Sequence, residues 1–231
     1  VAKKKILAIP EGDIFLKREV AILENYFEIR TAPRFNYKRP LTSIPSIFKI
    51  LKGTLWADLT FSWDAGIHAF FAVLFSKILR KKSLIIAGGY EVAKEPEIGY
   101  GAMLHPIGSH LAKFALKHAD RLLAFSEFNK KEILKYTKRK NIKVLHGTNP
   151  IDYDKFKPSG DKEDLVITTT TFISHSTIKR MGFETSIKAA QYMPNIRFAL
   201  IGKPIDDSIT HLKSIAPSNV TITGLVSDEE M

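Results

Sequence analysis

The sequence predicts an α/β protein of two doubly wound, parallel-sheet domains, the first complete and the second incomplete. Short apolar runs alternate with segments of helical periodicity along the chain, which is typical of strands joined by helical crossovers. A polar link at 159–164 interrupts this alternation, and three further apolar runs follow it. We predict a first domain over 1–150 and a second over 151–231, with the hinge in the segment 149–158 that lies between the two series of strands.

Six strands are expected in the first domain, each a short apolar run bounded by turn or helix signals. They are predicted at 5–9, 27–30, 59–63, 84–87, 122–125 and 142–145. Helices are predicted between them at 14–25, 65–79, 110–118 and 130–136. The basic segment 34–45 contains Pro40 and Pro45 and is predicted to be a loop near the rim of a cleft.

The second domain repeats the pattern with fewer elements. Strands are predicted at 165–170, 196–201 and 220–223, with helices at 182–192 and 208–215. Three strands and two helices make about half of a domain of this kind. We therefore expect the second domain to be incomplete in this chain.

The composition limits the cofactors and partners. The chain of 231 residues has a net charge of +11 and no cysteine, so a thiolate metal site is excluded. The absence of cysteine fits a reducing cytoplasm, where we predict the protein to be. The apolar window 65–79 is shorter than the roughly twenty residues of a bilayer span, and we predict a buried helix there. The lysines and arginines of the chain cluster at 77–82 and 130–143. They are either solvated helix faces or a surface for anionic lipid at the inner membrane face.

Nucleic acid is not an expected partner, despite the positive charge. The sequence contains no helix-turn-helix, zinc or RNP-like signature that would accompany nucleic-acid binding. The dinucleotide fingerprint GxGxxG is also absent after the first strand, which counts against NAD or FAD.

Candidate ligand-binding residues follow the predicted strands, because ligands collect at the carboxyl ends of parallel strands. Gly12 follows the first strand and could let backbone N–H groups approach a diphosphate. Trp63 and Asp64 end the third strand, with Trp63 a candidate stacking platform. His68, four residues later, is interpreted as a core histidine.

The connection after the fourth strand is the richest in chemistry. Gly88 and Gly89 allow close backbone approach by a ligand, and hydrogen-bonding or acid–base groups follow them. These groups are Tyr90, Glu91, Tyr100 and His105. Since long ordered loops in compact domains are usually functional, we predict a substrate-binding segment here.

In the second domain, cations and glycine follow two predicted strands. Lys179 and Arg180 lie in the segment 174–182, which opens a helix and suits a diphosphate. Gly202 and Lys203 end the next strand. The alternative interpretation of Lys179 and Arg180 is a solvated basic turn.

Several motifs, in order, resemble family 4 retaining glycosyltransferases of the GT-B fold. VLHGTNPIDYDKFKP at 144–158 resembles the interdomain crossover, and HADRLLAFSEFNKKEIL at 118–134 resembles the preceding Ala-Asp…Ser run. In that run Asp120 and Ser126 match the pattern, although both are also explained as helix caps. IRFALIGKP at 196–204 and NVTITGLVSDEEM at 219–231 resemble the donor-domain strands.

The resemblance implies two Rossmann-like domains, an acceptor half before the crossover and a donor half after it. It implies transfer of a sugar from a nucleoside-diphosphate sugar to a glycan or lipid-linked acceptor, with retention, no metal and no permanently bound cofactor. Three sets of residues are predicted on this basis. They are Tyr90 and Glu91 for catalysis; Gly12, Asn149, Lys179, Arg180, Gly202 and Lys203 for the donor; and Trp63, Asp64, Tyr100 and His105 for the acceptor.

Three departures from the family pattern leave a second hypothesis open. The usual His after the fourth strand is replaced by Gly88-Gly89-Tyr90-Glu91, and Met181 stands where a Lys is usual. The Glu-x₇-Glu stretch would lie beyond Met231, so we expect a chain truncated relative to the family. The alternative is therefore a non-catalytic glycosyltransferase-like binding or partner subunit.

Overall fold

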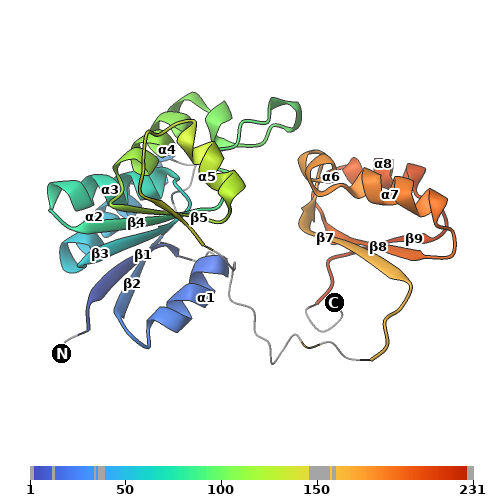
Figure 1. The fold of residues 1–231 in the computed structure, drawn as a ribbon, viewed down its shortest axis with the longest axis horizontal. Helices are drawn as coiled ribbons and strands as arrows, with labels where there is room; N and C mark the ends of the chain where they lie inside the picture. Colours follow the sequence, from blue (N-terminus) through green and yellow to red (C-terminus); the bar gives the residue numbers. More distant parts are fainter. Residues whose placement is uncertain are drawn as a thin grey trace. The chain divides into compact units, whose positions relative to one another are not determined.

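The computed structural model describes residues 3–11, 14–33, 35, 40–145, 157 and 160–227. The chain forms two compact units, the first containing the sheet of β1 to β6 and the second the sheet of β7 to β9 (Figure 1). The boundary predicted at 150/151 falls outside the described residues and stays a prediction. Gly12 and Asn149 also lie outside them.

The first unit contains a six-stranded parallel sheet in the order β2-β1-β3-β4-β5-β6. Each predicted strand of this domain is confirmed. The strands are β1 (Lys5–Glu11), β2 (Glu28–Pro33), β3 (Leu59–Trp63), β4 (Lys82–Ala87), β5 (Arg121–Ala124) and β6 (Ile142–Val144). Because the strands are parallel, their carboxyl ends meet at one edge of the sheet.

Helices cover both faces of this sheet. They are α1 (Ile14–Leu23), α2 (Ile44–Trp56), α3 (Ile67–Ile78), α4 (Pro106–His118) and α5 (Glu127–Leu134). Side chains alternate along β1: Ile6 and Ala8 pack in the cluster that contains Leu16 of α1, whereas Leu7 packs with Ile50 of α2. In Figure 1, α1 accordingly lies on the side of the sheet opposite α3, α4 and α5.

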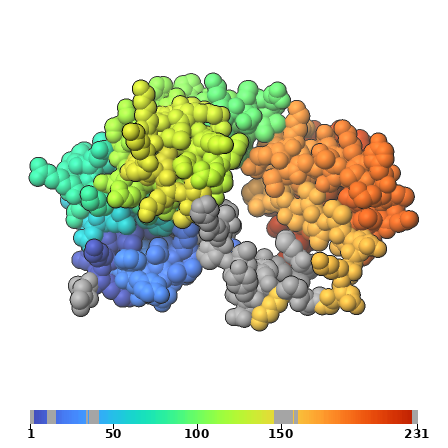
Figure 2. All heavy atoms as spheres, in the orientation of Figure 1, coloured from blue at the N-terminus to red at the C-terminus, as the bar shows by residue number. Residues whose placement is uncertain are grey.

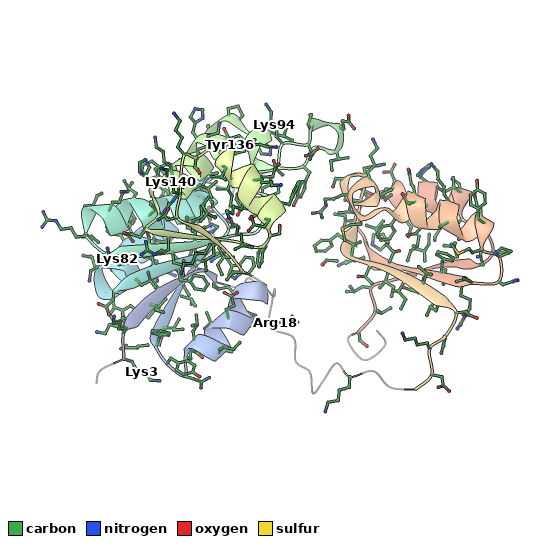
Figure 3. The ribbon with its side chains drawn as sticks, in the orientation of Figure 1. Lys3, Arg18, Lys82, Lys94, Tyr136 and Lys140 are labelled. Carbon is green, nitrogen blue, oxygen red and sulfur yellow. The ribbon has the colours of Figure 1, made fainter. Side chains whose placement is uncertain are left out.

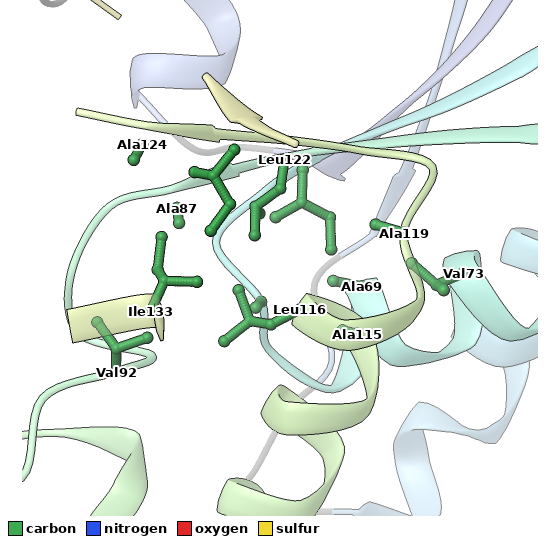
Figure 4. Packing of buried hydrophobic residues seen from close by; sticks show 13 residues of the cluster. Ala69, Val73, Ala87, Val92, Ala115, Leu116, Ala119, Leu122, Ala124 and Ile133 are labelled. Atoms are coloured by element: carbon green, nitrogen blue, oxygen red, sulfur yellow. The ribbon is translucent and has the colours of Figure 1, made fainter. Parts of the chain in front are cut away.

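The largest buried cluster of the first unit lies between the sheet and α3, α4 and α5 (Figure 4). Alanines and branched residues interdigitate there, among them Ala69, Ala115, Leu116, Leu122 and Ile133. In the space-filling view, the green-to-yellow atoms of α4 and α5 form one continuous surface over it (Figure 2). The carboxyl edge of the sheet is therefore supported by a packed core.

The prediction of a loop at 34–45 is wrong at its end, and α2 was not predicted. Pro40–Ser43 form a 3₁₀ helix and α2 begins at Ile44, with Pro45 in its first turn, where proline needs no N–H partner. Gly53 sits where an added Cβ would lie 2.5 Å from Leu7 Cδ1. Here glycine, usually a helix-weakening residue, lets α2 pack closely on β1.

The second unit contains a three-stranded parallel sheet in the order β7-β8-β9. Its predicted strands are confirmed as β7 (Leu165–Ile173), β8 (Arg197–Pro204) and β9 (Val220–Gly224). Its helices are α6 (His175–Met181), α7 (Phe183–Tyr192) and α8 (Ser208–Ile215). One cluster holds it together, with Phe183 and Leu200 fully buried.

The cations are spread over the surface of the first unit. Figure 3 labels five that are exposed: Lys3, Arg18, Lys82, Lys94 and Lys140. Among the described residues, no helix combines the length and the apolar composition that a bilayer span requires. The two α/β units confirm the predicted fold class.

Candidate functional site

A cavity of about 660 Å³ opens in the first unit, where β3 and β4 end and α3 and α4 begin. Its polar side chains come from two strand ends and from the connection that leads to α4. They are Asp64, His68, Tyr90, Glu91 and His105. The structure thus brings together four of the predicted site residues, Asp64, Tyr90, Glu91 and His105.

Glu91 is the most deeply placed of these groups, with only 2% of its surface exposed. Its Oε1 accepts a hydrogen bond from the Gly88 N–H at 2.7 Å, and its Oε2 accepts one from the Gly89 N–H at 2.8 Å. The two glycines at the end of β4 therefore act through their backbone: they hold the carboxyl group at the cavity wall.

The pKa of Glu91 is raised from its ordinary value of 4.5 to about 7. Burial is the larger cause, because it disfavours the charged carboxylate, and the nearby negative charge of Asp64 adds to it. The hydrogen bonds from Gly88 and Gly89 oppose the shift. A carboxyl group with this pKa can exchange a proton near neutral pH.

Asp64 stands beside it in a left-handed backbone conformation, with φ of 58°. This conformation turns the carboxylate back onto the start of α3, where its Oδ1 accepts from the Gly66 N–H at 2.7 Å. His68 Nε2 lies 3.2 Å from the same Oδ1 and 3.0 Å from the carbonyl oxygen of Trp63. Such a non-glycine φ is uncommon and often marks a functional position.

His68 is buried and hydrogen-bonded, as its interpretation as a core histidine requires. It also lines the cavity, and this second role was missed by sequence reasoning. The four-residue spacing from Asp64 was the available signal, because the tight turn from β3 into α3 brings His68 Nε2 to 3.2 Å from the Asp64 carboxylate.

Tyr90 and Tyr100 pack edge to face, with ring centroids 5.2 Å apart. Burial raises the pKa of Tyr90, and the neighbouring Tyr100 and Asp64 add to the shift, so its phenol keeps its proton. The turn after Tyr100 needs glycine: Gly101 has φ of 118°, and a Cβ there would lie 2.0 Å from the Ala93 carbonyl oxygen. This turn brings Tyr100 against Tyr90 beside the cavity.

Trp63 does not fit the predicted role of stacking platform. Its side chain is 6% exposed and packs against Phe125 with ring centroids 4.9 Å apart. The indole N–H donates to Glu19 Oε2 at 3.0 Å. Side-chain alternation along β3 explains the burial, because Trp63 shares the core-facing side of Phe61.

Asp120 and Ser126 have structural partners. Ser126 caps α5, its Oγ accepting from the Asn129 N–H at 3.1 Å, which is the expected cap. Asp120 caps no helix; its Oδ2 accepts from the N–H and the hydroxyl of Ser83 on β4, both at 3.0 Å. These contacts join β4 to the start of β5.

The predicted donor-binding cations of the second unit are exposed. Lys179 and Arg180 occupy the last turn of α6, a helix that was not predicted. The helix that the segment 174–182 was expected to open is α7, predicted at 182–192. The first turn of α6 is closed by its own residues: the Ser174 hydroxyl accepts from the Thr177 N–H, and the Thr177 hydroxyl accepts from the Ser174 N–H. Lys179 and Arg180 instead precede Gly182, where α7 begins.

The other predicted donor residues of this unit lie at the end of β8. Gly202 is buried, and a Cβ there would lie 2.7 Å from the Thr170 carbonyl oxygen, so packing against β7 accounts for this glycine. Lys203 follows it and is exposed. Nearby, His175 Nε2 lies 2.9 Å from Asp207 Oδ1, and both groups are exposed.

The comparisons with known proteins find resemblance only at the level of structure. No family model and no curated protein matches the sequence. Anabaena HepE, crystallised with UDP and glucose, superposes with a TM-score of 0.64 at 15% identity, covering 98% of this chain and 70% of its own. A putative UDP-N-acetylglucosamine 2-epimerase from Listeria monocytogenes gives 0.59 at 11% identity, with 100% and 71% covered.

A third structure, S. aureus MnaA with UDP, gives a TM-score of 0.58 at 14% identity, covering 96% of this chain and 69% of its own. The chain has the GT-B fold. This fold is shared by glycosyltransferases and epimerases that use nucleotide sugars, and at these identities the likeness concerns the fold alone.

Within the GT-B fold of this chain, the cavity belongs entirely to the first unit. Its polar wall is made by residues that follow β3 and β4, so the arrangement depends on the parallel sheet. A buried carboxyl group, an adjacent carboxylate and a protonated phenol can together bind a hydroxyl group and accept its proton.

Proposed function

We propose that this protein transfers a sugar from a nucleoside-diphosphate sugar to a hydroxyl group of a glycan or lipid-linked acceptor, with retention and without a metal. The observation that carries this proposal is Glu91, a buried carboxyl group with a pKa of about 7 at the wall of a cavity in a GT-B protein. The likeness to HepE, crystallised with UDP and glucose, supports the choice of donor.

The cavity supplies the acceptor side of the proposed reaction. The acceptor hydroxyl binds between Asp64 and Glu91, and His105 and Tyr100 contact the rest of the acceptor. The acceptor oxygen bonds to the anomeric carbon on the same face from which the diphosphate leaves, so that the configuration is retained as the bond from this carbon to the diphosphate breaks. Glu91 takes the hydroxyl proton, while the protonated phenol of Tyr90 hydrogen-bonds the reacting oxygens. Burial of Glu91 makes this proton transfer feasible near neutral pH.

The second unit supplies the donor side. Lys179, Arg180 and Lys203 are exposed cations that bind the diphosphate and stabilise the negative charge that develops as it leaves. The predicted donor residues Gly12 and Asn149 belong to the same proposal. UDP is the first nucleotide to test, because HepE and MnaA were both crystallised with it.

Donor binding is tested by thermal unfolding with a panel of UDP-, GDP- and ADP-sugars. At a hundred times its Kd, a bound donor stabilises a protein by about 2.7 kcal/mol. The variant Lys179→Gln/Arg180→Gln should weaken the affinity about tenfold, since it removes two charge-assisted contacts. Lys213→Gln, which changes an exposed lysine on α8 of the same unit, is the matched control. Stabilisation by none of these donors would refute the proposal.

Product analysis then separates transfer from isomerisation, the reaction of the epimerases that share this fold. Sugar transfer requires an added acceptor and releases the nucleoside diphosphate. Conversion of UDP-N-acetylglucosamine into its 2-epimer without an acceptor would replace transfer by epimerisation. Binding without any turnover would favour the non-catalytic binding subunit.

A further inference from the structure

The outer face of α2 carries an exposed apolar stripe. Ile44 is 47% exposed, Phe48 60% and Leu55 55%. These positions are four and seven residues apart, so they lie along one side of the helix. Leu51, half-buried, falls between Phe48 and Leu55 on the same side. An amphipathic helix normally turns such a stripe toward the core, whereas here it faces outward.

The opposite face of α2 is already occupied by the core. Ile50, Gly53 and Thr54 are buried, Gly53 packs closely on Leu7, and the Thr54 hydroxyl donates to the Ile50 carbonyl oxygen. The helix is therefore firmly seated on the sheet without its outer stripe. About half of the surface of Ile44, Phe48 and Leu55 nevertheless remains exposed.

The stripe belongs to a stretch of the chain that is basic and free of acidic residues. No Asp or Glu occurs over 29–57, which contains Arg30, Arg34, Lys38, Arg39, Lys49 and Lys52. None occurs over 65–90 either, which contains Lys77, Arg80, Lys81 and Lys82. These two acid-free segments include α2 and α3, which pack side by side. Each helix leads from the end of one parallel strand to the start of the next, so their C-terminal ends lie at the same edge of the sheet.

We propose that the outer face of α2, with the basic C-terminal end of α3, docks on an anionic lipid bilayer. This α2–α3 surface comprises Ile44, Phe48, Leu55, Lys49, Lys52, Lys77, Arg80 and Lys81. Its apolar stripe enters the boundary between headgroups and acyl chains, and its cations contact lipid phosphates. A nucleic acid would match the charge but would leave the apolar side chains of Ile44 and Leu55 without a complement.

The proposal is tested by co-sedimentation of the whole chain with vesicles. Wild-type protein should bind vesicles containing phosphatidylglycerol and should not bind vesicles of phosphatidylcholine alone. Binding should weaken as salt is raised, because exposed charges are screened. No binding to phosphatidylglycerol vesicles, or equal binding to both kinds, would overturn the proposal. Binding of RNA in place of vesicles would also overturn it and indicate a nucleic-acid surface.

Substitutions in α2 separate the two parts of the surface. Phe48→Ser/Leu55→Ser should reduce vesicle partitioning by about tenfold or more, since both apolar side chains lose their insertion. Lys49→Gln/Lys52→Gln should reduce it roughly tenfold on anionic vesicles only. Phe128→Ser is the matched control: Phe128 is 72% exposed on α5, where Glu127 and Glu132 pair with the adjacent lysines.

Insertion itself is measured with Phe48→Trp in a Trp56→Phe background, because Trp56 is the last residue of α2 and would otherwise contribute to the signal. Lipids brominated in their acyl chains should quench the fluorescence of this variant and leave the buried Trp63 unaffected. A fully retained signal, or unchanged partitioning of Phe48→Ser/Leu55→Ser, would contradict docking through α2. Because these readouts need no donor or acceptor, failure of lipid binding leaves the proposed sugar transfer untouched, and the reverse also holds.

Discussion

The two units end their parallel sheets in different ways. At the carboxyl edge of the first sheet, Glu91 is buried and held by two backbone N–H groups, with Asp64 beside it. In the second unit, the strand ends present exposed polar side chains, among them Lys203 at the end of β8 and His175 hydrogen-bonded to Asp207. At the first edge burial raises the pKa of a carboxyl group, whereas at the second hydrogen bonding to Ser208 lowers the pKa of the exposed Asp206 carboxyl.

The two edges differ because more buried residues pack against the sheet of the first unit than against the sheet of the second. Three buried clusters support the first sheet and one supports the second. Only a well-packed interior can exclude enough water to raise the pKa of a carboxyl group by burial. Exposed cations attract an anion, but solvent screens them. We therefore assign proton transfer to the first unit and diphosphate binding to the second.

The largest expected effect comes from Glu91→Gln, which tests the role of the first unit in chemistry. Removing a general base typically costs 10²–10⁴-fold in rate, so kcat should fall by about this factor. Donor affinity, assigned to the second unit, should change less than twofold. The measurement is steady-state transfer with the donor identified by thermal unfolding.

Glu95→Gln is the control for this prediction. Glu95 is an exposed residue of the same connection whose backbone pairs with Tyr100. It should retain the wild-type rate. If Glu91→Gln transferred sugar at the wild-type rate, proton transfer could not be assigned to the carboxyl edge of the first sheet.

The second prediction concerns stability and pH. The pKa of Glu91 is about 7 in the folded protein and 4.5 ordinarily, so the folded state retains a proton that the unfolded chain releases. Its contribution to stability is therefore present below about pH 4.5 and is lost as pH rises to 7, by up to about 3 kcal/mol. Urea unfolding at pH 5 and pH 8 measures this change.

The Glu91→Gln variant has no titrating group at this position, so its stability should vary less over the same pH range. If the stability of Glu91→Gln varied with pH as much as that of the wild type, a group other than Glu91 would cause the pH dependence. Activity should rise through about pH 7 in the wild type, because Glu91 accepts a proton only when ionised.

Much of the fold could be predicted because its strands are short apolar runs with clear ends. The residues that follow β3 and β4 could likewise be expected to meet, since parallel strands end at one edge. The helix α2 could not, because Pro45 and Gly53 suggest a loop and its apolar residues face both the core and the outside. The presence of Gly53 inside a helix is explained by its packing on Leu7, which the sequence does not reveal.

The details of the site depended on three-dimensional packing. That Gly88 and Gly89 hold Glu91 through their N–H groups follows from how the chain folds back after β4. The burial of Trp63 was foreseeable from the alternation of side chains along β3, which places it with Phe61. The position of Lys179 and Arg180 in the last turn of α6 was hidden, because the glycine that ends this helix also begins α7.

The smallest expected effect compares one helix cap in each unit. Ser174 caps α6 in a reciprocal pair with Thr177, whereas Ser126 caps α5 through a single bond to the Asn129 N–H. Replacing either serine by alanine should cost about 1 kcal/mol.

Because a single cluster supports the second unit, we expect Ser174→Ala to speed amide hydrogen exchange throughout that unit. Ser126→Ala, over a larger core, should speed exchange in α5 alone. If each substitution sped exchange only in the helix that it caps, the two units would differ in the chemistry of their sheet edges and not in the stability of their cores.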